Sequence, residues 1–283
     1  MTSRWSVRPT APACGAEVVG LDLSAATEDD LARVTEALQA HSVLFFRDQE
    51  IQPEQQLDIT RRFGPILRVP YIKHLDEFPD IIAVLKEADE QLISTFGGTW
   101  HSDFSFLDEP PSLTLLYAIE LPELGGDTLW SSQYAAYEAL SDGMKSLLGP
   151  LRAMQTAWPH GTKGPATGAA VSRSIGMVRN DQSADREVAQ PVVRIHPTTG
   201  RKALFVNPVY TQRFDDMTTD ESRPLLDFLF NHATKAEFTC RLRWAPGTLA
   251  IWDNRCLLHL AINDYDGSRR LLHRTTVAGD RPR

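Results

Sequence analysis

The chain has 283 residues, of which 42% are hydrophobic and 8% aromatic, so it is long enough to bury a substantial core in one domain. Its formal net charge of −8 gives no electrostatic reason to expect nucleic acid or an anionic membrane as a partner, because both attract basic surfaces. We therefore expect neither of these partners, and a small molecule instead.

The three cysteines, Cys14, Cys240 and Cys256, are odd in number and widely spaced. This is neither a disulfide framework nor a zinc-ligand pattern, so we expect reduced, structural thiols. The first 15 residues lack the apolar centre of a signal peptide, and no stretch approaches the roughly 18 apolar residues of a membrane span. These features predict a soluble, cytoplasmic protein.

Hydrophobic periodicity and turn residues predict helices and strands along the first half of the chain. Thr27 can cap the first helix, and a proline opens the second. In chain order we expect a helix over 26–41, a strand over 43–46, a helix over 53–63, strands over 80–85, 112–121 and 128–130, and a helix over 135–148.

Residues 159–190 are polar and have no sustained period, which is typical of a long surface excursion within a single domain spanning 1–283. Such a segment is either a lid over a site or an insertion with no role. Beyond it we expect strands over 192–196 and 202–207, a helix over 219–234, and strands over 238–244, 249–252 continuing toward 259, and 269–277. Many strands with a few flanking helices favour a mainly β fold, a double-sheet jelly roll.

A histidine and a carboxylate, His101 and Asp103, stand two positions apart in the segment Trp-His-Ser-Asp-Phe-Ser-Phe. On a strand, positions i and i+2 share a face, so both side chains can bind one ion. A third ligand is offered by His259, which lies in an apolar run. Two histidines and one carboxylate form a facial triad with three open positions, the arrangement associated with non-haem Fe(II) oxygenases.

The triad alone leaves alternatives open. A catalytic zinc can use the same three residues to activate water, as in a metal-dependent hydrolase, and a non-catalytic ligand-binding protein can keep the same fold. A His-x-Asp pair also arises by chance, and a lone histidine in an apolar strand is more often a hydrogen-bonded core residue.

The sequence around these residues resembles the TauD/TfdA family of Fe(II)/2-oxoglutarate-dependent dioxygenases over nearly its whole length. The resemblance rests on the His-x-Asp segment, on Leu-Pro-Glu-Leu-Gly-Gly-Asp-Thr-Leu-Trp at 121–130, on Trp-Asp-Asn-Arg at 252–255 before His259, and on Arg-Arg-Leu-Leu-His-Arg at 269–274. It implies that His101, Asp103 and His259 bind Fe(II), and that Thr128 and Arg270 hold the distal carboxylate of 2-oxoglutarate.

The resemblance also implies the reaction. The cosubstrate 2-oxoglutarate is oxidatively decarboxylated with O2 to succinate and CO2, and an unactivated C–H bond of the primary substrate is hydroxylated. Enzymes of this family are often homodimers or homotetramers. Without the resemblance, Arg270 would be interpreted as a surface salt-bridge partner and Thr128 as a strand residue after a turn.

Arg274 lies four residues beyond Arg270, so on a strand the two side chains share a face. In taurine-oxidising members of the family the matching arginine contacts a sulfonate, which implies an anionic substrate here; a cosubstrate-binding or structural role is the alternative. Where those members carry a histidine, a tyrosine and an asparagine, this chain has Val69, Ile72 and Gly97. Taurine's ammonium would be left without partners, so we expect another substrate.

The last third of the chain is similar to bacterial aryloxypropionate dioxygenases, at residues 200–207 and 238–244. An aromatic substrate suggests that Phe104, Phe106 and Phe205 line its pocket, although aromatic residues in strands are more often plain core. The candidate substrates are therefore sulfonates, sulfate esters and aryloxyalkanoates.

Overall fold

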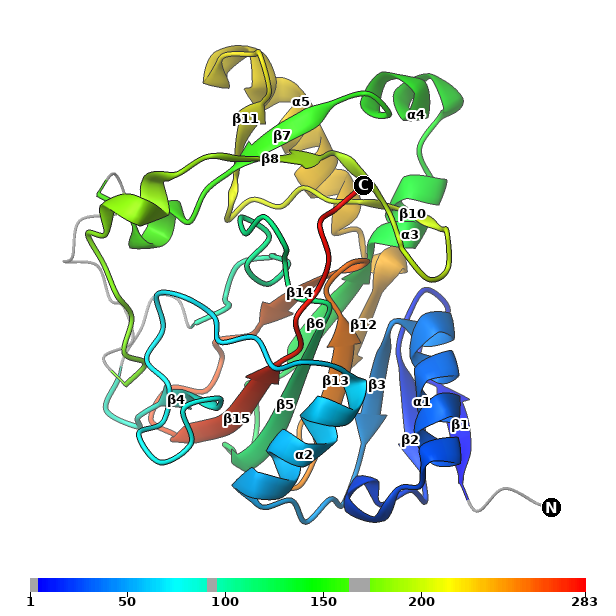
Figure 1. The fold of residues 1–283 in the computed structure, drawn as a ribbon, viewed down its shortest axis with the longest axis vertical. Coiled ribbons are helices and arrows are strands. Elements are labelled where there is room, and N and C mark those ends of the chain that lie inside the picture. The colour runs from blue at the N-terminus through cyan, green and yellow to red at the C-terminus, as the bar shows by residue number, and fades with distance from the viewer. Residues whose placement is uncertain (1–4, 91–95, 163–173) are drawn as a thin grey trace.

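The computed structural model describes residues 5–90, 96–162 and 174–283, and within these ranges the fold is mainly β, with a few helices around two facing sheets (Figure 1). The large sheet has the strand order β1-β2-β3-β13-β5-β15-β4, and the small sheet has the order β12-β6-β14. Neighbouring strands of the large sheet pair antiparallel, except β2 and β3, which pair parallel. The large-sheet strands are β1 (Ser6–Pro9), β2 (Ala16–Val19), β3 (Val43–Phe46), β4 (Ile82–Lys86), β5 (Leu113–Glu120), β13 (Leu249–Asp253) and β15 (Arg270–Thr276), and the small-sheet strands are β6 (Thr128–Ser132), β12 (Thr239–Leu242) and β14 (Leu257–Ala261).

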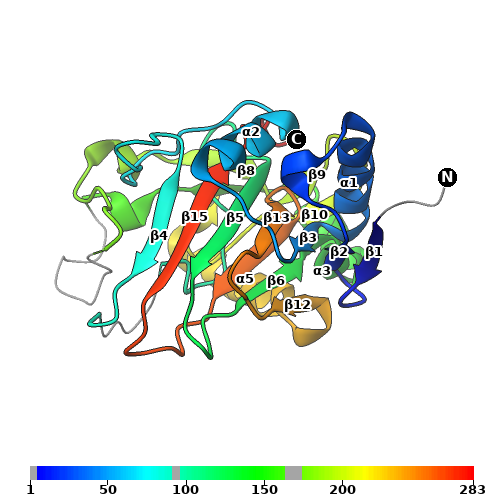
Figure 2. The ribbon, with the colours of Figure 1, turned by 90° about the horizontal axis from the view of Figure 1, so that it is seen from below.

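Helices and two further strand groups surround these sheets. Figure 2 shows α1 and α2 lying over the outer face of the large sheet. The remaining strands form the sheet β11-β7-β8 and the hairpin β9-β10. They are β7 (Arg152–Gln155), β8 (Val188–Pro191), β9 (Val193–Ile195), β10 (Lys202–Leu204) and β11 (Thr211–Phe214), and the helices are α1 (Glu28–His41), α2 (Pro53–Phe63), α3 (Gln133–Glu138), α4 (Asp142–Leu148) and α5 (Thr219–Ala233).

The central strands of the large sheet are buried on both faces. In β3, Leu44 and Phe46 pack with α1, whereas Val43 and Phe45 pack between the sheets. Successive strand side chains point to opposite faces, so a continuous run of apolar residues such as Val-Leu-Phe-Phe contributes to two cores at once. The inner core also contains Trp252 of β13, and there the two sheets meet.

Most expected elements are present with shifted ends, but three expectations are wrong. The helix expected over 135–148 is two helices, because the Ser141 side chain accepts a hydrogen bond from the Met144 amide and starts a new helix. The strand expected over 202–207 ends at Leu204. The strand expected over 249–252 does not continue toward 259, because β13 ends at Asp253 and, after a turn, β14 begins at Leu257 in the small sheet. Of the excursion 159–190, residues 163–173 lie outside the described part, and its last residues belong to β8, which pairs with β7.

In the ranges described, none of the helices has the length and apolar character needed to cross a membrane.

Candidate active site

Two histidines and one aspartate converge at one end of the space between the sheets. His259 lies in β14, and His101 pairs with it through a single antiparallel bridge whose N···O distances are 3.1 and 2.8 Å. The Nε2 atoms of His101 and His259 lie 3.6 and 3.8 Å from Asp103 Oδ1. All three ligand atoms lie within 4.8 Å of one another, and the side chains are buried. This donor set suits a divalent metal ion with open coordination positions.

The local backbone around Asp103 differs from the strand we expected. After the bridge at His101 the chain enters a turn that contains Asp103, and Phe104 adopts a left-handed φ of 47°. The two ligands therefore converge because the chain turns sharply behind the bridge, not because of strand alternation. A non-glycine residue with positive φ beside a metal ligand is a strained conformation that the surrounding packing has to maintain.

Both histidines are suited to metal binding in their neutral form. The Thr99 carbonyl lies 2.7 Å from His101 Nδ1, which places the proton on Nδ1 and leaves the Nε2 lone pair free for a metal. Burial lowers the pKa of His101, with Asp103 opposing it, and burial together with His101 lowers the pKa of His259 well below its usual range. Neutral imidazole is the form that coordinates metals.

The carboxylate of Asp103 is held ionised and oriented. Burial alone would raise its pKa, but Arg274, the two histidines and a hydrogen bond from Thr114 lower it overall. The Thr114 hydroxyl donates to Oδ2 over 2.7 Å, which leaves Oδ1 facing the histidines. Asn254 Nδ2 donates to that hydroxyl over 2.9 Å, and Trp252 Nε1 donates to Asn254 Oδ1 over 2.9 Å. Sequence reasoning did not single out Thr114 or Asn254; only the Trp-Asp-Asn-Arg segment signalled the latter.

The buried guanidinium of Arg270 lines a cavity beside the triad histidines. Arg270 is 4% exposed, and its Nε and Nη2 atoms have no hydrogen-bond partner in the described part of the chain. It is confined by Tyr265 and by Gly126, where an added Cβ would lie 3.0 Å from Arg270 Nε. Thr128, Arg270 and the triad histidines all line one narrow cavity. A buried cation with free donors is costly unless an anion binds there.

The hydroxyl of Thr128 is oriented by a tryptophan. Trp244 Nε1 lies 2.9 Å from Thr128 Oγ1, and an indole nitrogen can only donate. The Thr128 oxygen therefore accepts this bond, and its own proton is free to point into the cavity beside Arg270. A carboxylate in this cavity would meet a cation and a hydroxyl donor together.

Arg274 lines the narrow cavity and also a second, wider cavity of about 150 Å³. Its Nη2 lies 2.9 Å from Asp103 Oδ2, but its Nε and Nη2 lack hydrogen-bond geometry to any acceptor in the described residues. Arg270, Leu272 and Arg274 are the inward, buried positions of β15, so the expected shared face of the two arginines is confirmed. The cavity is lined by Phe96, Gly97, Gly98, Thr99, His101, Asp103, Phe104, Pro159, His160, Met177, Val209, Tyr210 and Arg274.

The expected substrate-pocket residues are placed at different depths. Gly97 and Phe104 line the cavity, and the Arg274 guanidinium lies 5.1 Å from the Phe104 ring centre. Gly97 has φ +75°, and a Cβ there would lie 3.3 Å from His101 Cε1. Val69, Ile72 and Phe106 pack behind the lining in the cluster that contains Phe104 and Tyr210. Phe205 lies under the buried guanidinium of Arg194, 5.0 Å away, and is not a lining residue.

Two polar lining residues escaped sequence reasoning. Tyr210 lies edge-on to Phe106, with ring centres 4.9 Å apart, and burial followed by the Asp103 charge raises its pKa, so the hydroxyl stays protonated. The His160 ring stacks on the Tyr71 ring with centres 5.3 Å apart, and its Nδ1 is hydrogen-bonded to the Val178 carbonyl over 3.0 Å. His160, with Pro159 and Met177, comes from the excursion 159–190, which therefore contributes to the cavity wall.

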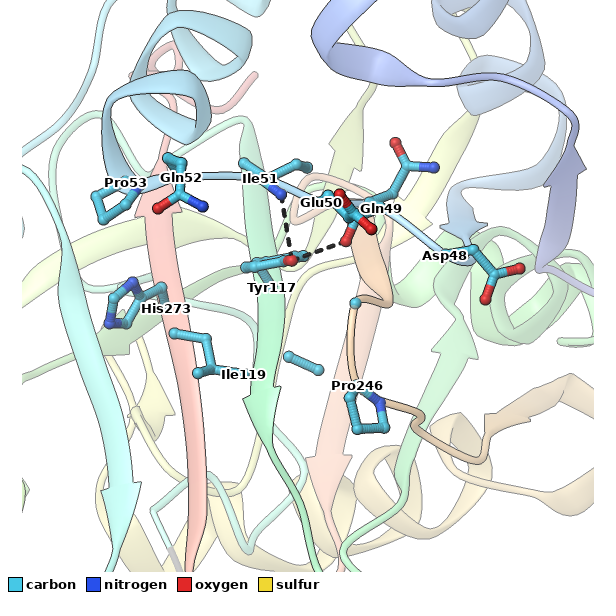
Figure 3. Close-up of a pocket in the computed structure, with 12 residues that line it drawn as sticks. Asp48, Gln49, Glu50, Ile51, Gln52, Pro53, Tyr117, Ile119, Pro246 and His273 are labelled. Carbon is cyan, nitrogen blue, oxygen red and sulfur yellow. Dashed lines mark hydrogen bonds between the residues drawn. The ribbon is translucent and has the colours of Figure 1, made fainter.

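A larger groove of about 610 Å³ lies on the opposite face of the large sheet (Figure 3). Tyr117 and His273 pair across β5 and β15 and alternate with the inward Leu116 and Arg274, so the groove is separated from the triad by the sheet. The Tyr117 hydroxyl donates to the Gln49 carbonyl at 2.8 Å and accepts from the Ile51 amide at 3.2 Å. These hydrogen bonds of Tyr117 hold the loop before α2 against the sheet. Among the described residues, the triad is the one cluster of side chains that could bind a metal ion, so the groove contains no second metal site.

Comparisons with known proteins agree with this geometry. The model of the family "Taurine catabolism dioxygenase TauD, TfdA family" matches residues 6–276. The chain is 32% identical to an alpha-ketoglutarate-dependent sulfate ester dioxygenase of Pseudomonas putida, covering 98% of this chain and 90% of that protein. It is 33% identical to the alpha-ketoglutarate-dependent 2,4-dichlorophenoxyacetate dioxygenase of Cupriavidus pinatubonensis, with 96% and 97% covered.

Among solved structures, a taurine dioxygenase from Burkholderia xenovorans superposes with a TM-score of 0.82 at 30% identity, covering 99% of this chain and 93% of that one. The match to the family model and the similarity to these relatives extend over almost the whole chain, and the triad expected of the family is present. The chain therefore belongs to the TauD/TfdA family and is an Fe(II)- and 2-oxoglutarate-dependent dioxygenase, an oxidoreductase that uses O2.

Proposed function

We propose that this dioxygenase hydroxylates a C–H bond of a small organic anion other than taurine, a sulfate ester or an aryloxyalkanoate. The observation that carries the proposal is the pair of buried arginines on one face of β15, both with donors that lack hydrogen-bond partners in the described part of the chain. Arg270 lines the narrow cavity, and Arg274 lines both cavities. Arg270 makes no ion pair within the described residues, and Arg274 is paired only with Asp103, a metal ligand, so each guanidinium can bind an added anion. One is the cosubstrate, and the other is the substrate.

In this proposal each site residue has a distinct role. His101, Asp103 and His259 hold Fe(II), which when bound supplies the activation of O2 coupled to decarboxylation of 2-oxoglutarate. Arg270 and the Thr128 hydroxyl bind the distal carboxylate of the cosubstrate in the narrow cavity. The hydrogen-bond series from Trp252 through Asn254 and Thr114 keeps the Asp103 carboxylate turned toward the metal. We also infer that the two facing sheets form the double-stranded β-helix of a cupin-like jelly roll.

The wider cavity is suited to a substrate with one anionic end. Arg274 supplies the cation, and the protonated Tyr210 hydroxyl makes no hydrogen bond within the described residues and can donate to the same anion. Phe96, Met177 and Val209 supply an apolar surface for the rest of the molecule. The only carboxylate among the described lining residues is Asp103, a metal ligand, so the ammonium of taurine would be buried without a counter-charge.

Two of the relatives act on anions of the proposed class. One acts on sulfate esters and another on 2,4-dichlorophenoxyacetate, and both substrates are anions with an oxygen-bearing carbon. Hydroxylation of the carbon next to that oxygen gives a hemiacetal-like product that collapses. The collapse releases sulfate or a phenol together with a carbonyl compound.

A succinate-formation screen tests the proposal. The Fe(II)-loaded protein is given 2-oxoglutarate, ascorbate and O2 with alkyl sulfates, alkyl sulfonates, both enantiomers of aryloxypropionates, or taurine. We expect succinate together with sulfate or phenol release for at least one oxygen-linked anion, and background succinate with taurine. Tyr210→Phe should raise the KM of that anion about fivefold, the effect of one lost hydrogen bond of about 1 kcal/mol, without changing the 2-oxoglutarate requirement. Turnover of taurine alone would refute the proposal.

A further inference from the structure

Two buried thiols face each other in the inner core. Cys14 lies on the loop between β1 and β2, and Cys240 lies in β12 of the small sheet. Their sulfur atoms are 3.5 Å apart, and the residues are 2% and 5% exposed. The site described above does not involve either thiol, and Cys256, the third cysteine, instead directs its sulfur to the Asp253 carbonyl at 3.8 Å.

The geometry allows the two sulfurs to bond. A disulfide requires an S–S distance of about 2.05 Å, so the atoms must approach by about 1.5 Å. Cys14 is outside any strand, and the next residue is Gly15, with φ +90°. A Cβ at position 15 would lie 2.8 Å from Cys240 Sγ, so the glycine is what lets this loop come so close to Cys240.

A series of contacting aromatic side chains connects this thiol pair to the triad. Cys240 is directly opposite Trp130 in the β12–β6 ladder, and the Cys14 sulfur lies 3.9 Å from the Trp130 carbonyl. The ring centres of Trp130 and Trp252 are 5.7 Å apart, and those of Trp252 and His259 are 4.8 Å apart. Trp130 is also opposite His259 in the β6–β14 ladder. No solvent intervenes, because all of these side chains are buried.

We propose that Cys14 and Cys240 form an internal reductant for the active site, oxidised to a disulfide through Trp130 and Trp252 when 2-oxoglutarate is consumed without primary substrate. The proposal rests on the dioxygenase activity proposed above. The reaction is balanced: 2-oxoglutarate, O2 and two thiols give succinate, CO2, one disulfide and one water. Each sulfur loses one electron, the S–S bond forms as the two S–H bonds break, and the two thiol protons end in the water.

Burial makes the pair insensitive to oxidants in solution, because neither sulfur is open to solvent. Thiolates are the form that reacts with peroxides, whereas the Cys240 thiol and burial raise the Cys14 pKa well above its usual range, so Cys14 stays protonated. Oxidation from the active site through the aromatic rings does not need a thiolate or access to solvent. The pair therefore spares the metal ligands and cavity-lining residues from oxidation during substrate-free turnover.

The experiment compares cysteine oxidation with succinate formation in the same samples. Full-length protein is loaded anaerobically with Fe(II) and 2-oxoglutarate, exposed to O2 without primary substrate and in the presence of catalase, alkylated, and mapped by mass spectrometry without reduction. We expect a Cys14–Cys240 cross-linked peptide, lighter by two hydrogens, that accumulates with succinate while Cys256 remains alkylated. Zinc-loaded protein should give no cross-link.

Trp130→Phe is the variant that tests the route. It should form succinate at the wild-type rate but several-fold less cross-link, and Cys240→Ser should form none. Succinate without cross-link in the wild type, or a cross-link that catalase prevents, would overturn the inference while leaving the dioxygenase activity intact. Absence of succinate would instead refute the activity and the inference with it. If Trp130→Phe does not fold, the wild-type arms with catalase and zinc still decide the question.

Discussion

The two sides of the active site are built in different ways. The metal and cosubstrate side consists largely of strand residues: His259 from β14, Thr128 from β6, and Arg270 from β15. Arg274, also in β15, is the strand residue that serves the substrate. The substrate side consists of connecting segments, with Phe96 and Gly97, the turn at Phe104, and the segments that carry His160, Met177 and Tyr210.

This difference separates chemistry from specificity. Paired strands hold their side chains at fixed positions, which a metal site and a carboxylate clamp need, whereas loops accept substitutions and changes in length. We therefore expect substitutions on the strand side to abolish the reaction and substitutions on the loop side to alter which molecule is oxidised.

Removal of a metal ligand should have the largest effect. His101→Ala should lower Fe(II) affinity by more than about 100-fold, since loss of even an outer partner of a ligand costs 10–100-fold, and should reduce succinate formation to background. Anaerobic Fe(II) titration and a succinate assay measure the two effects. His273→Ala is the matched control, because that histidine lies on the outer face of β15. This substitution should leave both Fe(II) affinity and succinate formation unchanged. Normal turnover by His101→Ala would remove the triad from the mechanism.

The two arginines of β15 should divide the two anions between them. Arg270→Ala should raise the 2-oxoglutarate requirement by about 30-fold or more, the effect of losing a buried charge partner worth at least about 2 kcal/mol, with a smaller change for the substrate. Arg274→Ala should do the reverse. Arg269→Ala, at the partly exposed arginine that pairs with Glu87 and Glu120, is the control. The check is the KM for 2-oxoglutarate and the KM for the substrate in each variant. If both KM values rose equally in both variants, this division would be contradicted.

The smallest effect concerns pH and the stability of the metal-free protein. Every histidine with a resolved shift has a lowered pKa, principally through burial, including His101 and His259 on the strand side and His160 on the loop side. Below the unfolded value of 6.5 the unfolded chain then binds more protons than the folded one. The free energy of unfolding should therefore fall as pH drops below 6.5, by at most about 1.4 kcal/mol per pH unit for each such histidine.

Urea titrations at several pH values in the presence of a chelator measure this slope. His160→Gln should make it shallower, since one of the buried neutral histidines is gone. An unchanged slope in His160→Gln would show that His160 does not contribute to the pH dependence.

The sequence predicted the strand side well for a physical reason. His259, Thr128 and Arg270 lie in regular strands, where alternation and the flanking turns determine which residues face inward. The structure brings His101 and Asp103 together as expected but through a different geometry, because the chain turns after His101 instead of continuing as a strand.

The loop side could not be derived in the same way. Tyr210 and His160 reach the cavity through irregular backbone and contacts between distant segments, such as the His160 bond to the Val178 carbonyl. No local pattern encodes these positions. Likewise, the partners of Asp103 come from β5 and from the turn after β13, so their convergence depends on sheet pairing that one sequence does not specify.

The position of both arginines on β15 limits how this enzyme can vary. Four residues of strand separate their backbones by about 13 Å at the usual rise per residue. The only irregularity nearby is in β5, where Leu271 pairs with Glu120 and Leu272 with Ala118, so Ile119 is left out of the ladder. Insertion of a single residue into β15 between the arginines would turn one of them to the outer face, beside Tyr117. Related chains that oxidise different molecules can therefore differ in the length of their loops, whereas the spacing from Arg270 to Arg274 must stay constant.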